Sequence, residues 1–204
     1  METKTHWDKV YTTKHSDEVS WYRKHLDMSL GLITGAVPNL DAQIIDVGGG
    51  EATLVDDLLA LGYRELCVLD ISATALSVAQ ARLGRDANNV RWLCDDVTSY
   101  PFKPAQFEVW HDRAVFHFLT DGPTREAYVR QVARAVKPGG HVIVATFGPE
   151  GPTKCSGLEV VRYDADRLHG QFGTAFRLVD HRTELHQTPS GAIQQFVYCY
   201  CRFG

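Results

Sequence analysis

The sequence predicts an α/β protein built on a mostly parallel sheet. From residue 43 to residue 147, short apolar runs that end in glycine or aspartate alternate with helical segments. This order is typical of parallel strands with helices on both faces of the sheet. After residue 174 come two long strand-like runs, FRLVDHRTELHQ and AIQQFVYCYCRF, joined by TPSG, which indicates an antiparallel hairpin. We therefore expect five parallel strands and a reversed C-terminal pair.

The elements of the first half follow from local patterns. The first 30 residues are rich in aromatic and charged side chains and predict one or two helices with a turn near Lys14 to Asp17. QIIDVG, ELCVLDI and VRWLCDDV have the length and apolar content of buried strands. TLVDDLLALG has its apolar residues on one helix face and ends at Gly62. Ser72 can cap the next helix, ATALSVAQARLG, which ends at Gly84.

The second half continues the alternation. PAQFEVWHD predicts a fourth strand, REAYVRQVARAV an amphipathic helix that PGG ends, and HVIVATF a fifth strand. The 204 residues fit one domain with a sizeable core. We expect 1–204 to be a single domain in three parts: a helical N-terminal segment (1–40), a cofactor-binding core (41–147), and a substrate-side loop with the C-terminal strands (148–204).

Composition excludes several classes of partner. The net charge of −4 gives no general attraction to nucleic acid or to an anionic membrane, so we expect neither. We find no apolar run that could span a bilayer, and METKTHWDKV lacks the apolar core of a signal peptide. The five cysteines include no C-x-x-C pair, and Cys199 and Cys201, two apart in a strand, are poorly placed to bridge each other. A reduced, cytoplasmic protein without a metal site is expected.

The run IIDVGGGEATL at 44–54 indicates a turn that binds a nucleotide cofactor. Gly48 and Gly50 occupy the first two positions of G-x-G-x-x-G, but Thr53 occupies the last, so the glycines alone do not decide the cofactor. Asp46 is more informative, because an acid at the end of the first strand would repel the pyrophosphate of a dinucleotide. S-adenosylmethionine has no phosphate and carries a positive sulfonium and a positive ammonium, which an acid would attract.

Two acids later in the chain are placed where they could bind the adenosine part of a cofactor. Asp70 lies about 20 residues after the glycines, where a ribose diol would accept a carboxylate, and this position suits either cofactor. In CDDV, Asp96 can accept the adenine amino group while the Val97 backbone N–H donates to a ring nitrogen. We prefer Asp96 to Asp95, because Val97 then occupies the place of the backbone contact.

Several motifs, in order, resemble a known family. IIDVGGGEATL, VLDIS, WLCDDV, FEVWHDRAVFHFL and VKPGGHVIVATF together resemble the class I S-adenosylmethionine-dependent methyltransferases over roughly residues 40 to 147. The resemblance implies a Rossmann-like three-layer sandwich, S-adenosylmethionine as cofactor and S-adenosylhomocysteine as product. The family's usual third glycine is Ala52 here. The implied cofactor contacts are Asp46, Gly48, Gly49 and Gly50 at the methionine moiety, Asp70 with Ile71 at the ribose, and Asp96 with Val97 at the adenine.

The aromatic N-terminal pattern HWDKVY…EVSWY is similar to a subset that includes small protein-lysine methyltransferases. There an aromatic segment lies over the cofactor, so Trp21 and Tyr22 are candidate cofactor contacts; packing of a helix onto the sheet is an equal alternative. Trp7 and Tyr11 are four residues apart on one helix face, and for them packing is the preferred interpretation.

The segment WHDRAVFHFL follows the fourth strand and supplies the catalytic candidates His111, Asp112 and Arg113. His111 could act as a general base or contact the cofactor, and Asp112 could orient an amine or hold the cofactor's ammonium. A structural ion pair between Asp112 and Arg113 is the alternative. His117 is expected to pack in the core, and Cys155, in a Gly- and Pro-rich loop, to have no chemical role.

The predicted function is transfer of a methyl group to a small-molecule acceptor. The acceptor would be selected by the N-terminal segment, the loop after the fourth strand and the loop at 148–163. There are two alternatives: the acceptor is a protein lysine, or the protein is a binding module without catalysis. A nicotinamide-dependent oxidoreductase is disfavoured by Asp46 and by the short chain.

Overall fold

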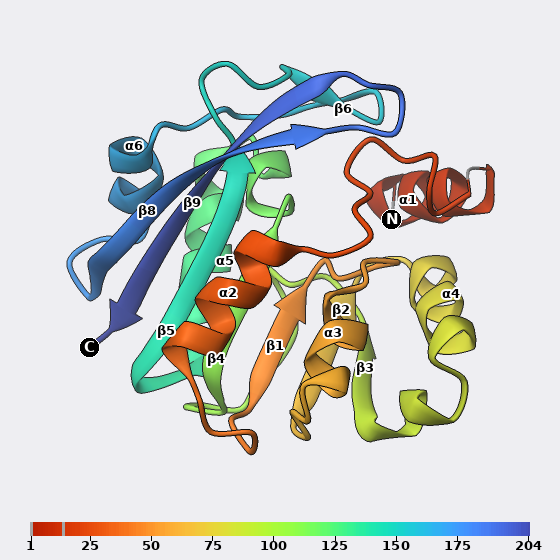
Figure 1. The fold of residues 1–204 in the computed structure, drawn as a ribbon. Coiled ribbons are helices and arrows are strands. Elements are labelled where there is room, and N and C mark those ends of the chain that lie inside the picture. Colours follow the sequence, from red (N-terminus) through yellow and green to blue (C-terminus); the bar gives the residue numbers. More distant parts are fainter. Residues whose placement is uncertain (1, 14) are drawn as a thin grey trace.

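A seven-stranded sheet forms the centre of the computed structural model, which describes residues 2–13 and 15–204. Its strands lie in the order β3-β2-β1-β4-β5-β9-β8 (Figure 1). β1 to β5 run parallel, whereas β9 runs antiparallel to both of its neighbours. The predicted sheet and its reversed C-terminal hairpin are thus confirmed. The strands are β1 (Ile44–Val47), β2 (Leu66–Asp70), β3 (Val90–Cys94), β4 (Phe107–Arg113), β5 (Val136–Phe147), β8 (Phe176–Gln187) and β9 (Ile193–Phe203).

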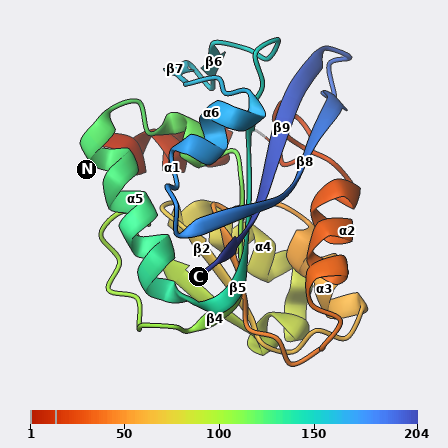
Figure 2. The ribbon, with the colours of Figure 1, turned by 90° about the vertical axis from the view of Figure 1, so that its left-hand side faces the viewer.

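Helices cover both faces of the sheet and complete a Rossmann-like three-layer sandwich. Seen edge-on, α5 lies on one side of the sheet and α2 on the other (Figure 2). One apolar cluster joins the sheet to α2, α3 and α4, and the other joins it to α5 and α6. The helices are α1 (Glu2–Thr13), α2 (Asp27–Ala36), α3 (Leu54–Ala60), α4 (Ala73–Leu83), α5 (Gly122–Ala135) and α6 (Ala165–Gly170), with 3-10 turns η1 (Gly84–Asn89) and η2 (Phe116–Phe118).

The inner strands are buried on both faces, as the apolar runs predict. In β1, Ile44 packs into the cluster with α2 and α3, while Ile45 packs into the cluster with α5. In β2, Val68 packs into the cluster with α2 and α3, and Leu69 packs into the cluster with α5. Because successive side chains of a strand point to opposite faces, an uninterrupted apolar run is what a doubly covered strand requires. The polar residues of these strands come at or near their carboxyl ends.

Most predicted boundaries agree with the structure. The Ser72 hydroxyl caps α4 by accepting from the Ala75 backbone N–H at 3.3 Å, and Gly84 follows its last residue. In the N-terminal segment a turn covers residues 16–18, which confirms that part of the prediction; Lys14 lies outside the described residues. Of the one or two helices expected in the first 30 residues, α1 lies wholly there, whereas α2 begins only at Asp27 and extends to Ala36, and residues 15–26 form turns and irregular structure.

Two features differ from the sequence prediction. The helix α5 ends at Ala135, and the PGG segment lies inside β5, where the pairing with β4 is irregular between Phe107 and Val109. The loop after β5 forms a small hairpin, β6 (Lys154–Cys155) with β7 (Leu158–Glu159), followed by the short helix α6. These short elements lack the apolar periodicity that would have indicated them.

The cysteine and membrane expectations can be compared with the structure directly. The Sγ atoms of Cys199 and Cys201 lie 3.5 Å apart on one face of β9, without a disulfide between them. Across residues 2–13 and 15–204, no helix is both long enough and apolar enough to cross a membrane.

Candidate active site

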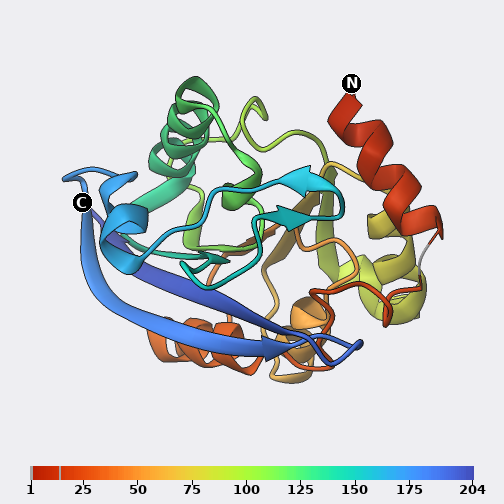
Figure 3. The same cartoon turned by 90° about the horizontal axis from the view of Figure 1, so that it is seen from above.

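A cavity of about 330 Å³ lies at the carboxyl ends of the parallel strands. This end is the upper one in Figure 1, where the strand β1 points toward α1 and the β6–β7 hairpin. From above, α1 flanks this end and the hairpin crosses it (Figure 3). Ligands of open α/β sheets bind at this edge, and the volume falls near the lower end of the roughly 300–1,000 Å³ usual for ligand pockets. We call this space the large cavity.

The glycine turn brings its backbone to the wall of the large cavity. Gly48 has a φ of +68°, and a Cβ there would lie 1.9 Å from the Val115 side chain. Gly50 has a φ of +46°, and its Cβ would lie 2.9 Å from the Tyr11 hydroxyl and 3.1 Å from an Asp70 oxygen. Only glycine adopts this conformation without strain and leaves this space open. Both glycines are therefore required by backbone shape and by close packing.

Asp70 ends β2 and lines the large cavity. Its carboxylate accepts hydrogen bonds from the backbone N–H groups of Ser72, at 2.8 Å, and Gly50. Burial, together with the nearby charge of Asp46, raises the pKa of Asp70 to about 7. A buried carboxylate in this state is an acceptor site for the hydroxyl groups of a ligand.

The loop after β3 closes the far wall of the large cavity. Asp95, Asp96, Val97 and Thr98 all line it, so both acids of CDDV reach the cavity. One oxygen of Asp96 accepts from the Thr98 backbone N–H at 2.8 Å and from its hydroxyl at 2.7 Å. These bonds fix the loop conformation next to Val97.

A second, smaller cavity of about 40 Å³ adjoins the glycine turn on the side of Asp46. Asp46 and Glu51 line it and are each only 6% exposed. The Glu51 Oε2 atom is buried without a hydrogen-bond partner in the described structure, and burial raises the pKa of Glu51. Gly48, Trp21 and Arg113 line both cavities, so the small cavity lies next to the large one.

The sequence matches known proteins through the elements that form these cavities. Residues 44–140 match a family described as a methyltransferase domain. The chain is 23% identical over 167 residues to the eEF1A lysine and N-terminal methyltransferase of Danio rerio, covering 80% of this chain and 24% of that protein. It therefore spans about a quarter of that relative's length. Over 194 residues it is 19% identical to EEF1A lysine methyltransferase 2 of Homo sapiens, covering 88% of this chain and 76% of that protein.

A solved structure has the same fold. The N-methyltransferase NodS from Bradyrhizobium japonicum, in complex with S-adenosylhomocysteine, superimposes with a TM-score of 0.72 at 13% identity, covering 98% of each chain. The family match and this fold agree with the cofactor motifs, which stand in order along the sheet edge. Residues 44–140 thus form a methyltransferase domain, and the chain has the fold of the class I S-adenosylmethionine-dependent methyltransferases. S-adenosylmethionine is thus its cofactor and S-adenosylhomocysteine the product.

The two cavities of the methyltransferase fit this cofactor. The buried Glu51 Oε2 atom lacks a donor and Asp46 lines the same small cavity, so an ammonium group bound there would pair with both acids. The buried Asp70 carboxylate faces the large cavity, where the two ribose hydroxyls would donate to it. The carboxylates of Asp46, Glu51 and Asp70 would repel a pyrophosphate, whereas the arginines that line the small cavity are already paired with Glu184, so the lining favours the cationic cofactor.

Aromatic side chains of the methyltransferase cover the large cavity. Trp7 and Tyr11 of α1 line it together with Trp21 and Phe118. The ring centroids of Trp7 and Phe118 lie 5.1 Å apart, and those of Tyr11 and Trp21 lie 6.2 Å apart. Packing was the preferred interpretation of Trp7 and Tyr11; the rings do pack, but they also form the cavity wall. In the sequence, the aromatic pattern with Trp21 and Tyr22 as candidate contacts indicated that an aromatic segment covers the site.

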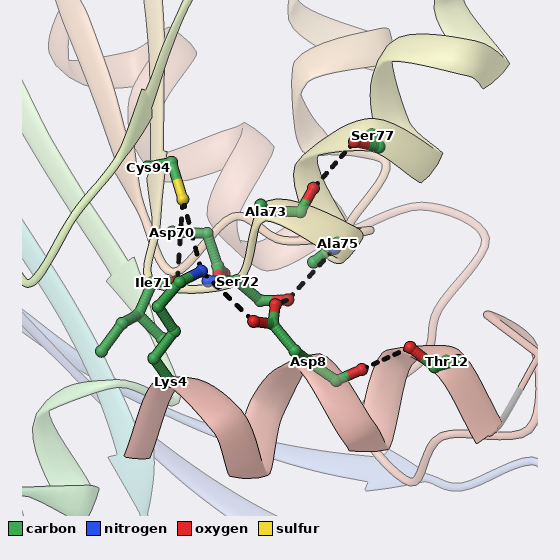
Figure 4. Close-up of polar contacts among 10 residues, drawn as sticks. All are labelled: Lys4, Asp8, Thr12, Asp70, Ile71, Ser72, Ala73, Ala75, Ser77 and Cys94. Atoms are coloured by element: carbon green, nitrogen blue, oxygen red, sulfur yellow. Dashed lines mark hydrogen bonds and ion pairs between the residues drawn. The ribbon is translucent and has the colours of Figure 1, made fainter. Parts of the chain in front are cut away.

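Polar contacts hold α1 in this position (Figure 4). The Ser72 hydroxyl, at the N-terminus of α4, donates to Asp8 at 2.6 Å. The Lys4 ammonium donates to Asp8 and to the Ile71 backbone carbonyl, each at 3.2 Å. Ile71 itself lines the large cavity. The contacts of α1 therefore reach the loop that follows Asp70.

The three catalytic candidates on β4 lie in different surroundings. His111 is buried and lines the small cavity, with Nδ1 2.7 Å from Asp46 and Nε2 2.9 Å from the Ser29 hydroxyl. Asp112 faces α5 and accepts from the Tyr128 hydroxyl at 2.6 Å. Asp112 also accepts from two backbone N–H groups of the following turn, and burial raises its pKa to about 6. Arg113 alone of the three lines the large cavity.

Arg113 has a partner that the sequence did not indicate. The expected alternative, an ion pair with Asp112, does not form, because the two side chains point to opposite faces of β4. The guanidinium instead lies 3.3 Å from Glu184 of β8 and over the Phe196 ring, 4.0 Å from its centroid. Its Nε donates to the Tyr198 hydroxyl at 3.1 Å.

The remaining candidates occupy the following places. Tyr22 lines the small cavity and not the large one. Gly49 lies against Asp46, where a Cβ would come within 2.7 Å of Oδ2.

His117 packs as expected: its Nδ1 accepts from the Phe147 backbone N–H at 3.2 Å, and burial lowers its pKa to about 3. Cys155, in the β6–β7 hairpin, is buried and lines the large cavity. Among the described residues, no cluster of three side chains could hold a metal ion.

Proposed function

We propose that this methyltransferase transfers a methyl group from S-adenosylmethionine to a small molecule that enters the large cavity beside Trp21 and Phe118. The observation that carries this proposal is the lining of the cavity beyond the cofactor motifs. That part is apolar and aromatic, and the aromatic rings of α1 cover it. Its members are Trp7, Tyr11, Trp21, Ala114, Val115, Phe118, Leu119 and Cys155.

An enclosed aromatic site suits a small, flat or apolar acceptor. Aromatic rings bind such molecules through large contact areas and fixed ring geometry. Arg113 is the basic side chain of the cavity lining, and Glu184 compensates its charge, so an acceptor in this part meets mainly rings and aliphatic groups. We therefore favour a small neutral acceptor over a protein lysine.

The chain's own residues would act mainly by positioning. When bound, S-adenosylmethionine supplies a methyl group already activated by positive sulfur. Asp70 and the loop at 95–98 would orient the adenosine, and the acids of the small cavity would orient the ammonium. Trp7, Trp21 and Phe118 would align the acceptor and exclude water. Such alignment can contribute about 7–11 kcal/mol to lowering the barrier.

The test is a transfer assay with methyl-labelled S-adenosylmethionine. The protein is incubated separately with mixed small thiols, amines and phenols and with desalted lysate protein, and Asp70→Asn serves as the matched inactive control. Label in the low-mass fraction supports the proposal. Label in a protein band supports the lysine alternative, which the names of the two relatives favour. Cofactor binding with no transfer in either arm would support a non-catalytic binding module.

A further inference from the structure

A buried chain of hydrogen bonds connects the acid of the glycine turn to the C-terminal hairpin. Asp46 Oδ1 lies 2.7 Å from His111 Nδ1, and His111 Nε2 lies 2.9 Å from Ser29 Oγ. Ser29 Oγ lies 3.2 Å from the Tyr198 hydroxyl, which in turn donates to Glu184 Oε2 at 3.2 Å. The five side chains come from β1, β4, α2, β9 and β8, and none is more than 7% exposed.

Two arginines neutralise the far end of this chain. Glu184 accepts from both Arg23 and Arg113, and Arg113 also donates to Tyr198. A buried carboxylate is costly unless it is paired and hydrogen-bonded, and this one is both. The Tyr198 hydroxyl is therefore held in place from the side opposite Ser29.

The near end of the chain determines how Asp46 is oriented. An ionised carboxylate can only accept, so His111 Nδ1 carries the proton in its contact with Oδ1. Oδ2 then remains beside Gly49, on the lining of the small cavity. Because the Tyr198 proton goes to Glu184, the single proton of the Ser29 hydroxyl goes either to Nε2 or to the Tyr198 oxygen, and Ser29 Oγ lies against Nε2 in either case.

We propose that His111, Ser29 and Tyr198 are positioning residues that hold the Asp46 carboxylate toward the ammonium group of the cofactor. The inference rests on the proposed function only through the cofactor, not through the acceptor. Preorganised binding groups require a supporting layer whose own conformations are locked, and this chain supplies one from three distant elements. It also gives His111 a role that does not require contact with the acceptor.

The first experiment removes single hydroxyl groups and measures binding of S-adenosylhomocysteine by calorimetry. Ser29→Ala removes the contacts of its hydroxyl with His111 and Tyr198, and Tyr198→Phe removes the hydroxyl contacts with Ser29, Glu184 and Arg113. Each should weaken binding about two- to tenfold. Tyr200→Phe is the matched control, because Tyr200 lies on the same strand as Tyr198 and its hydroxyl lies 2.6 Å from another histidine, His141 of β5. Tyr200 lines neither cavity, so its variant should bind as tightly as the wild type.

The second experiment tests whether His111 acts through Asp46. His111→Asn keeps an N–H near the position of Nδ1, whereas His111→Leu keeps only volume. We expect the asparagine variant to retain most of the affinity and the leucine variant to lose on the order of tenfold or more. Melting curves without cofactor identify any variant that fails to fold. If a His111 variant fails to fold, Ser29→Ala, on α2, tests the same inference.

Three outcomes would overturn the inference. Equal, unchanged affinity in the leucine and asparagine variants would show that Asp46 needs no support. A fall in kcat with unchanged affinity in both would make His111 a catalytic base. Wild-type protein that does not bind S-adenosylhomocysteine at all would overturn the proposed function as well, which distinguishes the two failures.

Discussion

Asp70 and Glu51 are buried acids whose partners within the chain are incomplete. Each has a pKa raised by burial, and each faces a cavity. Perturbed acids of this kind gather at functional sites, because a binding site keeps charges that folding alone would not favour. Replacing either acid by its amide should therefore stabilise the fold without cofactor and weaken the binding of the cofactor.

For Asp70 the pH dependence of stability follows from the raised pKa. The folded state holds the proton more tightly than the unfolded state, so the stabilisation is present below about pH 4 and is lost as the pH rises through about 7. Asp70→Asn cannot titrate. Its unfolding free energy relative to the wild type should therefore increase between pH 4.5 and pH 8, measured by urea unfolding without cofactor.

The same variant should bind S-adenosylhomocysteine on the order of 10- to 100-fold more weakly, because hydrogen bonds to a charged group are lost. Asp86→Asn, at an exposed position, is the control for both measurements. A stability difference that is constant with pH would contradict the assignment.

Glu51→Gln tests the small cavity. The substitution keeps the shape and removes the negative charge, so binding of the cofactor ammonium should weaken about tenfold. Stability without cofactor should be equal or greater, since a buried, half-paired carboxylate is replaced. Calorimetry and melting curves measure the two effects, with exposed Glu65→Gln as the control. Unchanged affinity would place the ammonium elsewhere.

At the scale of elements, α1 is held over the large cavity by few contacts. Its aromatic face packs on Trp21 and Phe118, and its polar face reaches α4 through Asp8 and Ser72. Helices with few packed neighbours open locally at low free-energy cost. Access to the large cavity should therefore depend on this helix.

Asp8→Ala should loosen α1. The change removes the acceptor of the Ser72 hydroxyl and the partner of Lys4. Amide hydrogen exchange in residues 2–13 should become several-fold faster, while exchange in α5, which packs elsewhere, stays unchanged. Lys9→Ala, on the exposed side of α1, is the matched control. Equal exchange in both variants would show that the aromatic contacts alone hold the helix.

At the scale of the whole molecule, the sheet order brings the C-terminal hairpin close to the cofactor site. β9 pairs with β5, which pairs with β4, so Tyr198 comes near Arg113 and, through Ser29, near His111. Glu184 of β8 joins the same group. Folding of the hairpin and formation of the site should therefore be linked.

Cofactor binding should stabilise the entire fold. At 100 times its Kd, a ligand that binds only the native state contributes about 2.7 kcal/mol. For a domain of this size this corresponds to a rise in Tm of about 5–10 °C with S-adenosylhomocysteine, measured by calorimetric melting. Reduced nicotinamide cofactor at the same concentration should give no rise. The reverse pattern would contradict the cofactor.

Much of the fold could be predicted because the relevant patterns are local. The strands and the helices from α3 to α5 follow from periodicity, glycines and caps, and the acids at 46, 70 and 96 follow from their places at strand ends. The small hairpin around Cys155 and the helix α6 could not be predicted, because two-residue strands and a six-residue helix carry no period.

The sequence by itself determined the order of the elements, the glycine turn and the acids along the cofactor edge. Only the tertiary structure decided that Trp7 and Tyr11 line the cavity, that Arg113 pairs with Glu184 and not with Asp112, and that His111 connects Asp46 to Tyr198. The physical reason is one of range. Backbone geometry and apolar periodicity act over a few residues, whereas the partner of a buried polar side chain depends on which distant elements pack against it.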